Sequence, residues 1–220
     1  MNEKRKLFVF NVSGPYAVGK DTTLRELKSI YGTHVYRVRT LTTRPVSPEA
    51  DPTYEQVSPQ ELQRRLSSGR WMLNYQLSGL TAYATSIDEI EEVGEAGFIC
   101  ILSVYAGPDG AGKLREVFGL RVLSIGLLPA PGSVAQQLEV LRARLLGRSR
   151  DDPAAIEARL QHQEEPLRYV LDNPVITTED GLRRVFDHVL VNEDLDVTVR
   201  RTVQLFDRAF FEGATDERTI

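Results

Sequence analysis

Short apolar runs alternate with amphipathic segments along most of the chain. The apolar runs predict strands at residues 7–12, 34–38, 98–102, 121–128 and 188–192. Segments with helical spacing or capping residues predict helices at 22–30, 58–68, 86–96, 114–118, 133–148, from 152 onward, and at 195–211. Strands that are separated by helices pair in parallel and are buried on both faces. The pattern therefore predicts an α/β fold, with a central parallel sheet and helices on both faces.

One segment departs from this alternation. Residues 40–85 contain a polar loop rich in proline, a short strand at 54–57, the capped helix at 58–68, and two strands at 71–77 and 80–85. Ser78-Gly79 between the last two strands indicates a hairpin. The segment predicts a lobe of residues 40–85 that is inserted into a single domain of residues 1–220.

The first apolar run leads into a glycine-containing loop, which is followed by a helix. The loop reads Gly14-Pro15-Tyr16-Ala17-Val18-Gly19-Lys20. Glycines let backbone N–H groups converge on phosphate oxygens, and the helix that follows points its positive end at the same anion. A lysine at this spacing reaches the outer phosphates. A chance glycine-rich turn is the alternative, but the strand–loop–helix context favours a P-loop NTPase fold with a phosphate site at the carboxyl edge of the sheet.

Asp21 stands where the P-loop motif has a serine or threonine that binds Mg²⁺. A carboxylate is a hard oxygen ligand, so Asp21 can bind Mg²⁺ directly, and the Thr22 hydroxyl is an alternative ligand. The structural alternative is that Asp21 only caps the helix.

Composition narrows the possible functions. The 220 residues are 41% hydrophobic and 26% charged, with a formal net charge of -4, so the chain lacks the overall basic character of nucleic-acid-binding proteins. No apolar run is long enough for a membrane span, and the polar start, residues 1–6, does not resemble a signal peptide. We therefore expect a cytoplasmic protein with no nucleic-acid or membrane partner.

The remaining candidate metal and redox residues are few. The single cysteine, Cys100, excludes an internal disulfide framework and is predicted to be buried in the core. The three histidines, His34, His162 and His188, are scattered and show no metal-ligand spacing.

Several motifs occur in the order that characterises one family. They are the P-loop; Thr40-Leu41-Thr42-Thr43-Arg44-Pro45; Tyr83-Ala84-Thr85; Arg144 and Arg148 followed by Ile156 and Arg159-Leu160; and Val191-Asn192-Glu193-Asp194-Leu195-Asp196. Together they resemble the guanylate kinase family of nucleoside monophosphate kinases, over about residues 6–206. The resemblance implies ATP- and Mg²⁺-dependent transfer of a phosphoryl group to a small phosphorylated acceptor.

The resemblance also implies a donor site and a lid. The implied ATP-binding residues are Gly14, Tyr16, Ala17, Val18, Gly19, Lys20, Asp21, Thr22 and Asn192, the last near the adenine. Lys20 would hold the β and γ phosphates. Arg144 and Arg148 would close over the transferring group, with Arg159 as a clamp, in a lid of residues 144–159. Arginine suits this role because its planar fork binds phosphate oxygens in pairs. A solvated helix face is the structural alternative for Arg144 and Arg148.

The acceptor site that the resemblance implies lies in the inserted lobe and at one strand end. Its residues are Thr40, Arg44, Tyr54, Asn74, Tyr83, Thr85 and Ser103. Arg44 would bind the acceptor's phosphate, with help from the hydroxyls of Tyr54 and Tyr83. Packing in a half-buried strand is the structural alternative for the two tyrosines.

Departures from the family pattern concentrate where the family reads guanine. Asn74 stands where the family has a glutamate, and Ser103 and Tyr105 stand at aspartate positions, although an offset alignment matches Asp109 to one of these. A carboxylate only accepts hydrogen bonds, as guanine N1–H and N2–H₂ require, whereas asparagine both donates and accepts. We therefore expect a kinase whose acceptor is not assured to be GMP.

Two further features bear on function. The Gly-Lys-Asp sequence also resembles the P-loop of the ribose 1,5-bisphosphate phosphokinases and of some deoxynucleotide kinases. Compared with the guanylate kinase pattern, about eleven residues are inserted between Arg159 and Asn192, near 170–184. A catalytically silent guanylate kinase-like binding or regulatory module is the alternative function. Such modules lose the P-loop lysine and the lid arginines, which are retained here.

Overall fold

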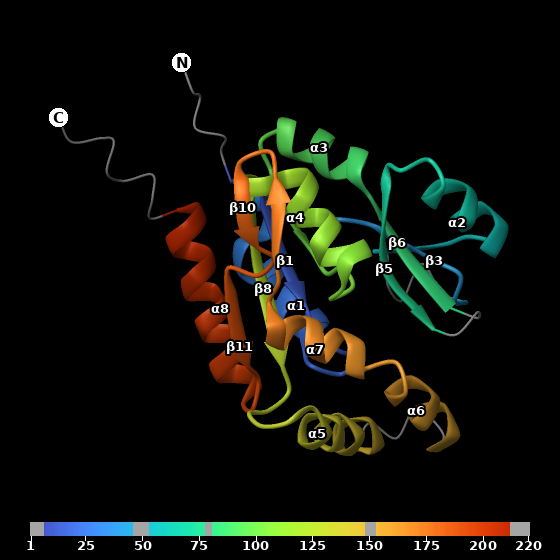
Figure 1. Cartoon of the computed structure of the whole chain (residues 1–220). Coiled ribbons are helices and arrows are strands. Elements are labelled where there is room, and N and C mark those ends of the chain that lie inside the picture. Colours follow the sequence, from blue (N-terminus) through green and yellow to red (C-terminus); the bar gives the residue numbers. More distant parts are fainter. Residues whose placement is uncertain (1–6, 46–52, 78–80, 148–152, 212–220) are drawn as a thin grey trace.

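A parallel sheet forms the centre of the molecule (Figure 1). The computed structural model describes residues 7–45, 53–77, 81–147 and 153–211. The five strands lie in the order β11-β8-β1-β7-β2, and all four pairings are parallel. Their bounds are β1 Val9–Ser13, β2 Val35–Arg37, β7 Ile99–Leu102, β8 Val122–Leu128 and β11 His188–Val191. The predicted α/β fold is confirmed.

Alternate strand residues pack against two helical layers. On one face, Phe10 and Val12 contact a core shared with α1 (Lys20–Tyr31) and α8 (Leu195–Phe210). On the other face, Val9 and Leu102 belong to the larger core under α3 (Ile87–Glu95), α4 (Lys113–Phe118) and α7 (Glu164–Asp172). The period of two in a strand explains this division. Among the described helices, none is long and apolar enough to cross a membrane.

Cys100 lies on β7 inside the larger core, as predicted. Burial raises the pKa of its thiol to about 12, and the Glu89 carboxylate adds to this in the same direction. The thiol therefore remains protonated at neutral pH and behaves as a small apolar group.

A second sheet, of four strands in the order β4-β3-β6-β5, extends from the core (right side of Figure 1). Its strands are β3 Thr40–Thr42, β4 Tyr54–Gln56, β5 Trp71–Leu77 and β6 Thr81–Ser86, and α2 (Pro59–Leu66) packs on it. Leu41, Leu62 and Ala84 form its own small core. The sequence analysis did not predict β3. The turn predicted at Ser78-Gly79 lies outside the described residues.

The stretch between α5 (Val134–Leu146) and β11 differs most from expectation. The single helix that was predicted from residue 152 is two helices, α6 (Pro153–Leu160) and α7, separated at 161–163. The insertion near 170–184 contains an antiparallel hairpin, β9 (Val175–Thr178) and β10 (Gly181–Arg184). Its side chains are largely exposed, with Leu182 at 69%, so no alternation of apolar and polar residues marked it in the sequence.

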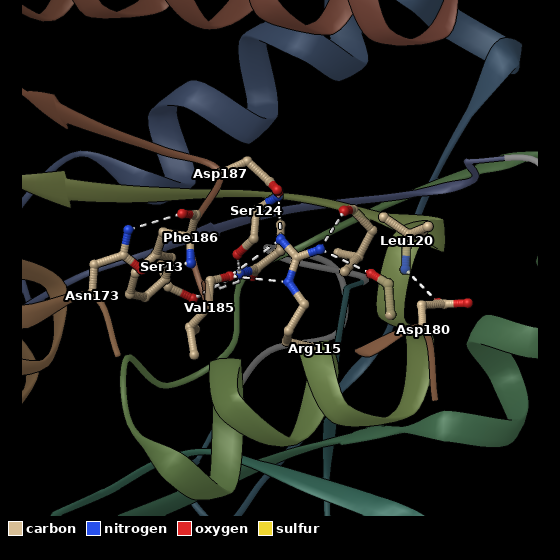
Figure 2. Close-up of polar contacts among 12 residues, drawn as sticks. Ser13, Arg115, Leu120, Ser124, Asn173, Asp180, Val185, Phe186 and Asp187 are labelled. Atoms are coloured by element: carbon tan, nitrogen blue, oxygen red, sulfur yellow. Dashed lines mark hydrogen bonds and ion pairs between the residues drawn. The ribbon is translucent and has the colours of Figure 1, made fainter. Parts of the chain in front are cut away.

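The inserted hairpin is fastened to the core by one buried arginine (Figure 2). Arg115 on α4 is 1% exposed. Its guanidinium donates hydrogen bonds to the carbonyls of Gly119 (2.8 Å), Val122 (3.0 Å) and Val185 (3.3 Å), and forms an ion pair with Asp187. These groups join α4, the start of β8 and the chain after β10, so one side chain ties three segments together.

The base of the hairpin is closed by an asparagine side chain, which both donates to and accepts from the backbone of one residue, as a neighbouring strand would. Asn173, which ends α7 with a φ of 40°, accepts a hydrogen bond from the Phe186 backbone N–H at 2.9 Å and donates to the Phe186 carbonyl at 2.9 Å. Asp180 at the hairpin tip accepts from the Leu120 backbone N–H (Figure 2). The hairpin is therefore closed on itself at its base, and its tip lies against the α4–β8 connection.

A buried polar cluster lies in the centre of the sheet, below the loop that follows β1. The Asn11 side-chain amide donates to the hydroxyls of Ser13 (3.0 Å) and Ser124 (2.8 Å), and its oxygen accepts from the Val104 backbone N–H (3.3 Å). The Ser13 hydroxyl in turn donates to the Val104 carbonyl at 2.8 Å. The cluster joins β1 to β8 and to the segment after β7. It is linked to the arginine network because Asp187 accepts from the Ser124 backbone N–H at 2.7 Å.

We predict that Arg115→Met lowers the free energy of unfolding by about 3–5 kcal/mol, because it removes the buried guanidinium that donates to three backbone carbonyls and pairs with the Asp187 carboxylate. Urea denaturation measures the change. Arg200→Met, on the exposed side of α8, is the matched control and should remain within about 0.5 kcal/mol of the parent chain. Equal stability of the two variants would contradict the structural role of Arg115.

We predict that Asn11→Val lowers the free energy of unfolding by about 1–3 kcal/mol, because the Ser124 hydroxyl and the Val104 N–H lose a buried partner. Ser124→Ala removes the other side of one of these bonds. Removing both partners leaves fewer buried polar groups without a hydrogen bond. The double variant should therefore lower the free energy of unfolding by less than the sum of the two single changes. Strict additivity in urea denaturation would show that the two residues do not interact.

Candidate active site

The loop between β1 and α1 has the backbone of a tight cradle. Gly19 has a φ of 102°, and a Cβ there would lie 2.5 Å from the Asn192 side-chain nitrogen, so only glycine fits. Ala17 is also left-handed, with a φ of 62°. These positions turn the chain sharply at the carboxyl edge of the sheet, where ligands bind in α/β folds.

Side chains satisfy the backbone groups of this loop. The buried Asn192 amide donates to the Val18 carbonyl at 2.7 Å. The Lys20 ammonium donates to the carbonyls of Gly14 (3.0 Å) and Pro15 (2.7 Å). Asn192, which was predicted to lie near the adenine, therefore lies against the loop itself, at the end of β11.

A pocket of about 650 Å³ opens beside the loop and brings together residues that are far apart in the sequence. Residues predicted for the donor site and for the acceptor site both line it. Arg37, Tyr105, Gln163 and Pro166 also line it, although the sequence analysis had not assigned a role to them. The lining consists of Gly14, Tyr16, Lys20, Asp21, Arg37, Thr40, Tyr54, Tyr83, Ser103, Val104, Tyr105, Gln163 and Pro166.

Two tyrosine rings line the pocket, and the exposed Arg44, which is not among the lining residues, lies next to one of them. The rings of Tyr54 and Tyr83 meet edge to face, with centroids 6.0 Å apart, and the Arg44 guanidinium carbon lies 5.9 Å from the Tyr54 centroid. Burial raises the pKa of the Tyr83 hydroxyl, although the nearby Arg44 opposes this. The hydroxyl is therefore a hydrogen-bond donor at neutral pH. Both tyrosines pack, as the structural alternative requires, and both also line the pocket.

Arg37 is a cation that the sequence analysis did not identify. It ends β2, and its guanidinium donates to the exposed Asp21 carboxylate at 3.1 Å. A second guanidinium nitrogen is buried and has no partner among the described residues. The position of Arg37 at the last residue of a parallel strand was the available signal. That strand end lies at the same sheet edge as the P-loop.

The predicted lid arginines lie in different surroundings. The Arg159 guanidinium carbon is 5.0 Å from the centroid of the Tyr16 ring, directly beside the loop. Arg144 is half-buried, and its guanidinium donates to the backbone carbonyls of Pro129 and Asn192. Arg148 lies outside the described residues. Of the two lid arginines that the structure describes, Arg159 lies against the P-loop.

The remaining residues named for the acceptor site, and Tyr105 beside Ser103, lie in different surroundings. Ser103 and Tyr105 line the pocket, whereas Thr85 is fully buried in β6 and does not. The turn after Tyr105 wraps tightly around it, since a Cβ at Gly110 would lie 2.2 Å from the Tyr105 carbonyl oxygen. Asn74 is the extra residue where the pairing of β5 and β6 shifts register.

The candidate Mg²⁺ ligands suit a metal that arrives with a nucleotide. Asp21 is exposed and Thr22 half-buried in the first turn of α1, so a carboxylate and a hydroxyl are adjacent. The described residues contain no group of three or more His, Cys, Asp or Glu that could hold a metal. Mg²⁺ is commonly held by one or two protein oxygens together with substrate phosphates. The donor set therefore fits Mg²⁺ in that mode.

Comparison with known proteins agrees with this geometry. A family model described as guanylate kinase matches residues 4–209. The guanylate kinase of Symbiobacterium thermophilum is 30% identical over 222 residues, covering 99% of this chain and 100% of that protein. The guanylate kinase of Prochlorococcus marinus is 26% identical, covering 93% and 98%. The crystal structure of guanylate kinase from Anaplasma phagocytophilum shares the fold, with a TM-score of 0.57 at 20% identity, over 94% and 88% of the two chains. The chain therefore belongs to the guanylate kinase family of P-loop kinases.

Proposed function

We propose that this chain transfers the γ-phosphoryl group of ATP, with Mg²⁺, to a nucleoside monophosphate or a similar small phosphate monoester. One observation carries the proposal: Lys20 and Asp21 of the P-loop share a pocket with Thr40, Tyr54 and Tyr83 of the second sheet. A donor cradle and a separate polar wall that face each other are what transfer between two phosphorylated substrates needs. The names of the family relatives point to the same reaction class.

The donor half depends on the loop and on Lys20. In this proposal the Lys20 ammonium leaves the Gly14 and Pro15 carbonyls and binds the outer phosphate oxygens. Mg²⁺, when bound near Asp21 and Thr22, neutralises phosphate charge. Arg159, beside Tyr16, approaches the transferring group from the α6 side, with Arg144 and Arg148 as further lid residues. Because the reaction needs positioning and charge neutralisation, these cations carry most of the chemistry.

The acceptor half depends on the second sheet. Arg44 and the hydroxyls of Tyr54 and Tyr83 bind the acceptor's phosphate in this proposal. Thr40 lines the pocket with the two tyrosines, and Arg44 lies next to the Tyr54 ring. The raised pKa of Tyr83 supports its part, because a protonated hydroxyl can donate to a phosphate oxygen. Orienting the acceptor phosphate toward Lys20 would supply the alignment that transfer requires.

The lining of the pocket argues for an acceptor other than GMP. Among the described lining residues the single carboxylate is Asp21, which belongs to the P-loop and pairs with Arg37. Guanine would present N1–H and N2–H₂ donors, whereas the nearby groups, Ser103 and Tyr105, are neutral hydroxyls, which donate as well as accept and are weaker acceptors than a carboxylate. Asp109 of the alternative alignment is exposed and outside the pocket. An acceptor with hydroxyl or carbonyl groups would suit these residues better, with Asn74 as a further contact.

We predict that the protein, supplied with Mg-ATP, releases ADP when a suitable acceptor is added. The panel contains the nucleoside monophosphates and ribose phosphates, and a coupled assay measures ADP. We expect at least one acceptor to stimulate release and GMP not to be the best of them, because the pocket lacks a carboxylate for guanine. Lys20→Ala is the inactive control. ADP release that no acceptor stimulates would refute the kinase proposal, and GMP as the best acceptor would refute the argument on specificity.

We predict that Tyr83→Phe raises the KM for the acceptor about tenfold or more, because a hydrogen bond to a charged group is lost while the ring remains. The KM for ATP should stay the same. Tyr31→Phe is the matched control: its hydroxyl donates to Asp207 at 2.7 Å, between α1 and α8 and away from the pocket. If Tyr83→Phe leaves the acceptor KM unchanged, Tyr83 is a packing residue only.

A further inference from the structure

Gln163 makes an unusual contact for a residue at a helix junction. It lies between α6 and α7 and is 1% exposed, yet its side chain also lines the pocket. The side-chain oxygen accepts a hydrogen bond from the Tyr16 backbone N–H at 2.6 Å. The side-chain nitrogen donates to the Arg159 carbonyl at 3.0 Å. One glutamine therefore connects the P-loop to the end of the helix that carries Arg159.

The same P-loop residue receives a second contact from this segment. The Arg159 guanidinium lies over the Tyr16 ring, with 5.0 Å between the guanidinium carbon and the ring centroid. Backbone and side chain of Tyr16 are thus both engaged by residues of the α6–α7 junction, here residues 159–163. In Figure 1 this junction lies at the lower end of the molecule, between the helices labelled α6 and α7.

The Tyr16 N–H, which donates to Gln163, is a backbone N–H of the P-loop. Such loops bind phosphate oxygens through their backbone N–H groups. Tyr16 lines the same pocket as Tyr54, Tyr83 and Gln163. A backbone N–H carries a single proton. A phosphate oxygen that binds this N–H must therefore displace the Gln163 oxygen.

We propose that Gln163 is a positioning residue that competes with the terminal phosphate of ATP for the Tyr16 N–H, so that phosphate binding releases the α6–α7 junction from the P-loop. The proposal rests on the proposed function. Because Gln163 also holds the Arg159 carbonyl, its release frees the segment that carries Arg159 to move relative to the loop. Coupling of this kind is reciprocal, so the Gln163 contact lowers the affinity for ATP by as much as ATP lowers the occupancy of the contact.

Two substitutions separate competition from a purely structural role. Gln163→Leu keeps the volume of the buried side chain but removes the acceptor oxygen, so the Tyr16 N–H becomes available to phosphate. Gln163→Glu keeps an acceptor and adds a negative charge beside the P-loop, which strengthens the contact and repels phosphate. Competition predicts opposite changes in ATP affinity for the two variants. A residue that only supports the fold predicts losses for both.

Isothermal titration with Mg-ATP and with Mg-ADP tests the proposal on the full chain. We expect Gln163→Leu to bind ATP about fivefold more tightly, the equivalent of one ordinary hydrogen bond, with a change of less than about twofold for ADP. Gln163→Glu should bind ATP about tenfold more weakly. The matched control is Gln161→Ala, two residues earlier and exposed, which should bind as the parent does. Melting temperatures establish that each variant is folded.

The outcomes are distinguishable. Weaker or unchanged ATP binding by Gln163→Leu would overturn the proposal, as would an equal gain for ADP, since the competing group would then not be the terminal phosphate. If Gln163→Leu does not fold, unchanged ATP affinity of Gln163→Glu overturns the proposal. A loss of ATP affinity in a folded Gln163→Glu supports it only when ADP affinity falls by less than about twofold, because a structural loss would weaken both nucleotides. Failure of the parent chain to bind ATP would instead refute the proposed function itself, and this inference with it.

Discussion

A P-loop presents backbone groups that no helix or strand can pair, and buried backbone groups need partners. In this chain the partners are side chains from distant segments. Asn192, at the end of β11, donates to the Val18 carbonyl, and Lys20, in the first turn of α1, donates to two loop carbonyls. Gln163, at the start of α7, accepts from the Tyr16 N–H. The conformation of the loop therefore depends on the closure of the whole sheet and on the packing of α7.

Buried hydrogen bonds extend this dependence from the loop to the far side of the domain. Asn11 connects Ser13, Ser124 and the Val104 backbone, and Ser124 continues through Asp187 to Arg115. Such networks carry a desolvation cost, which is recovered only when each member is satisfied. They specify one arrangement of β1, β7 and β8. The inserted hairpin is held by the same network, which explains how an insertion with an exposed surface can belong to the core structure.

Charge divides the pocket into two halves. Lys20, Arg37 and the nearby Arg159 surround the P-loop, and Asp21 is the single carboxylate among the described lining residues. The lining that other segments contribute is aromatic and hydroxyl-rich, with Tyr54, Tyr83 and Tyr105. Family membership accounts for the donor half, because it is the part shared by P-loop kinases. The aromatic and hydroxyl wall is where this chain can differ in what it phosphorylates.

The sequence by itself determined the parallel sheet, the P-loop and the family, because apolar runs and a contiguous glycine–lysine spacing are local signals. Local patterns could not reveal the β9–β10 hairpin, whose short strands are exposed, or the break before α7. Nor could they reveal that Arg37 meets Asp21, that Asn192 supports the loop, or that Gln163 reaches Tyr16 across 147 positions. These contacts involve ordinary polar residues in unremarkable local contexts. Only the folded chain brings them together, because their partners lie on other strands and helices.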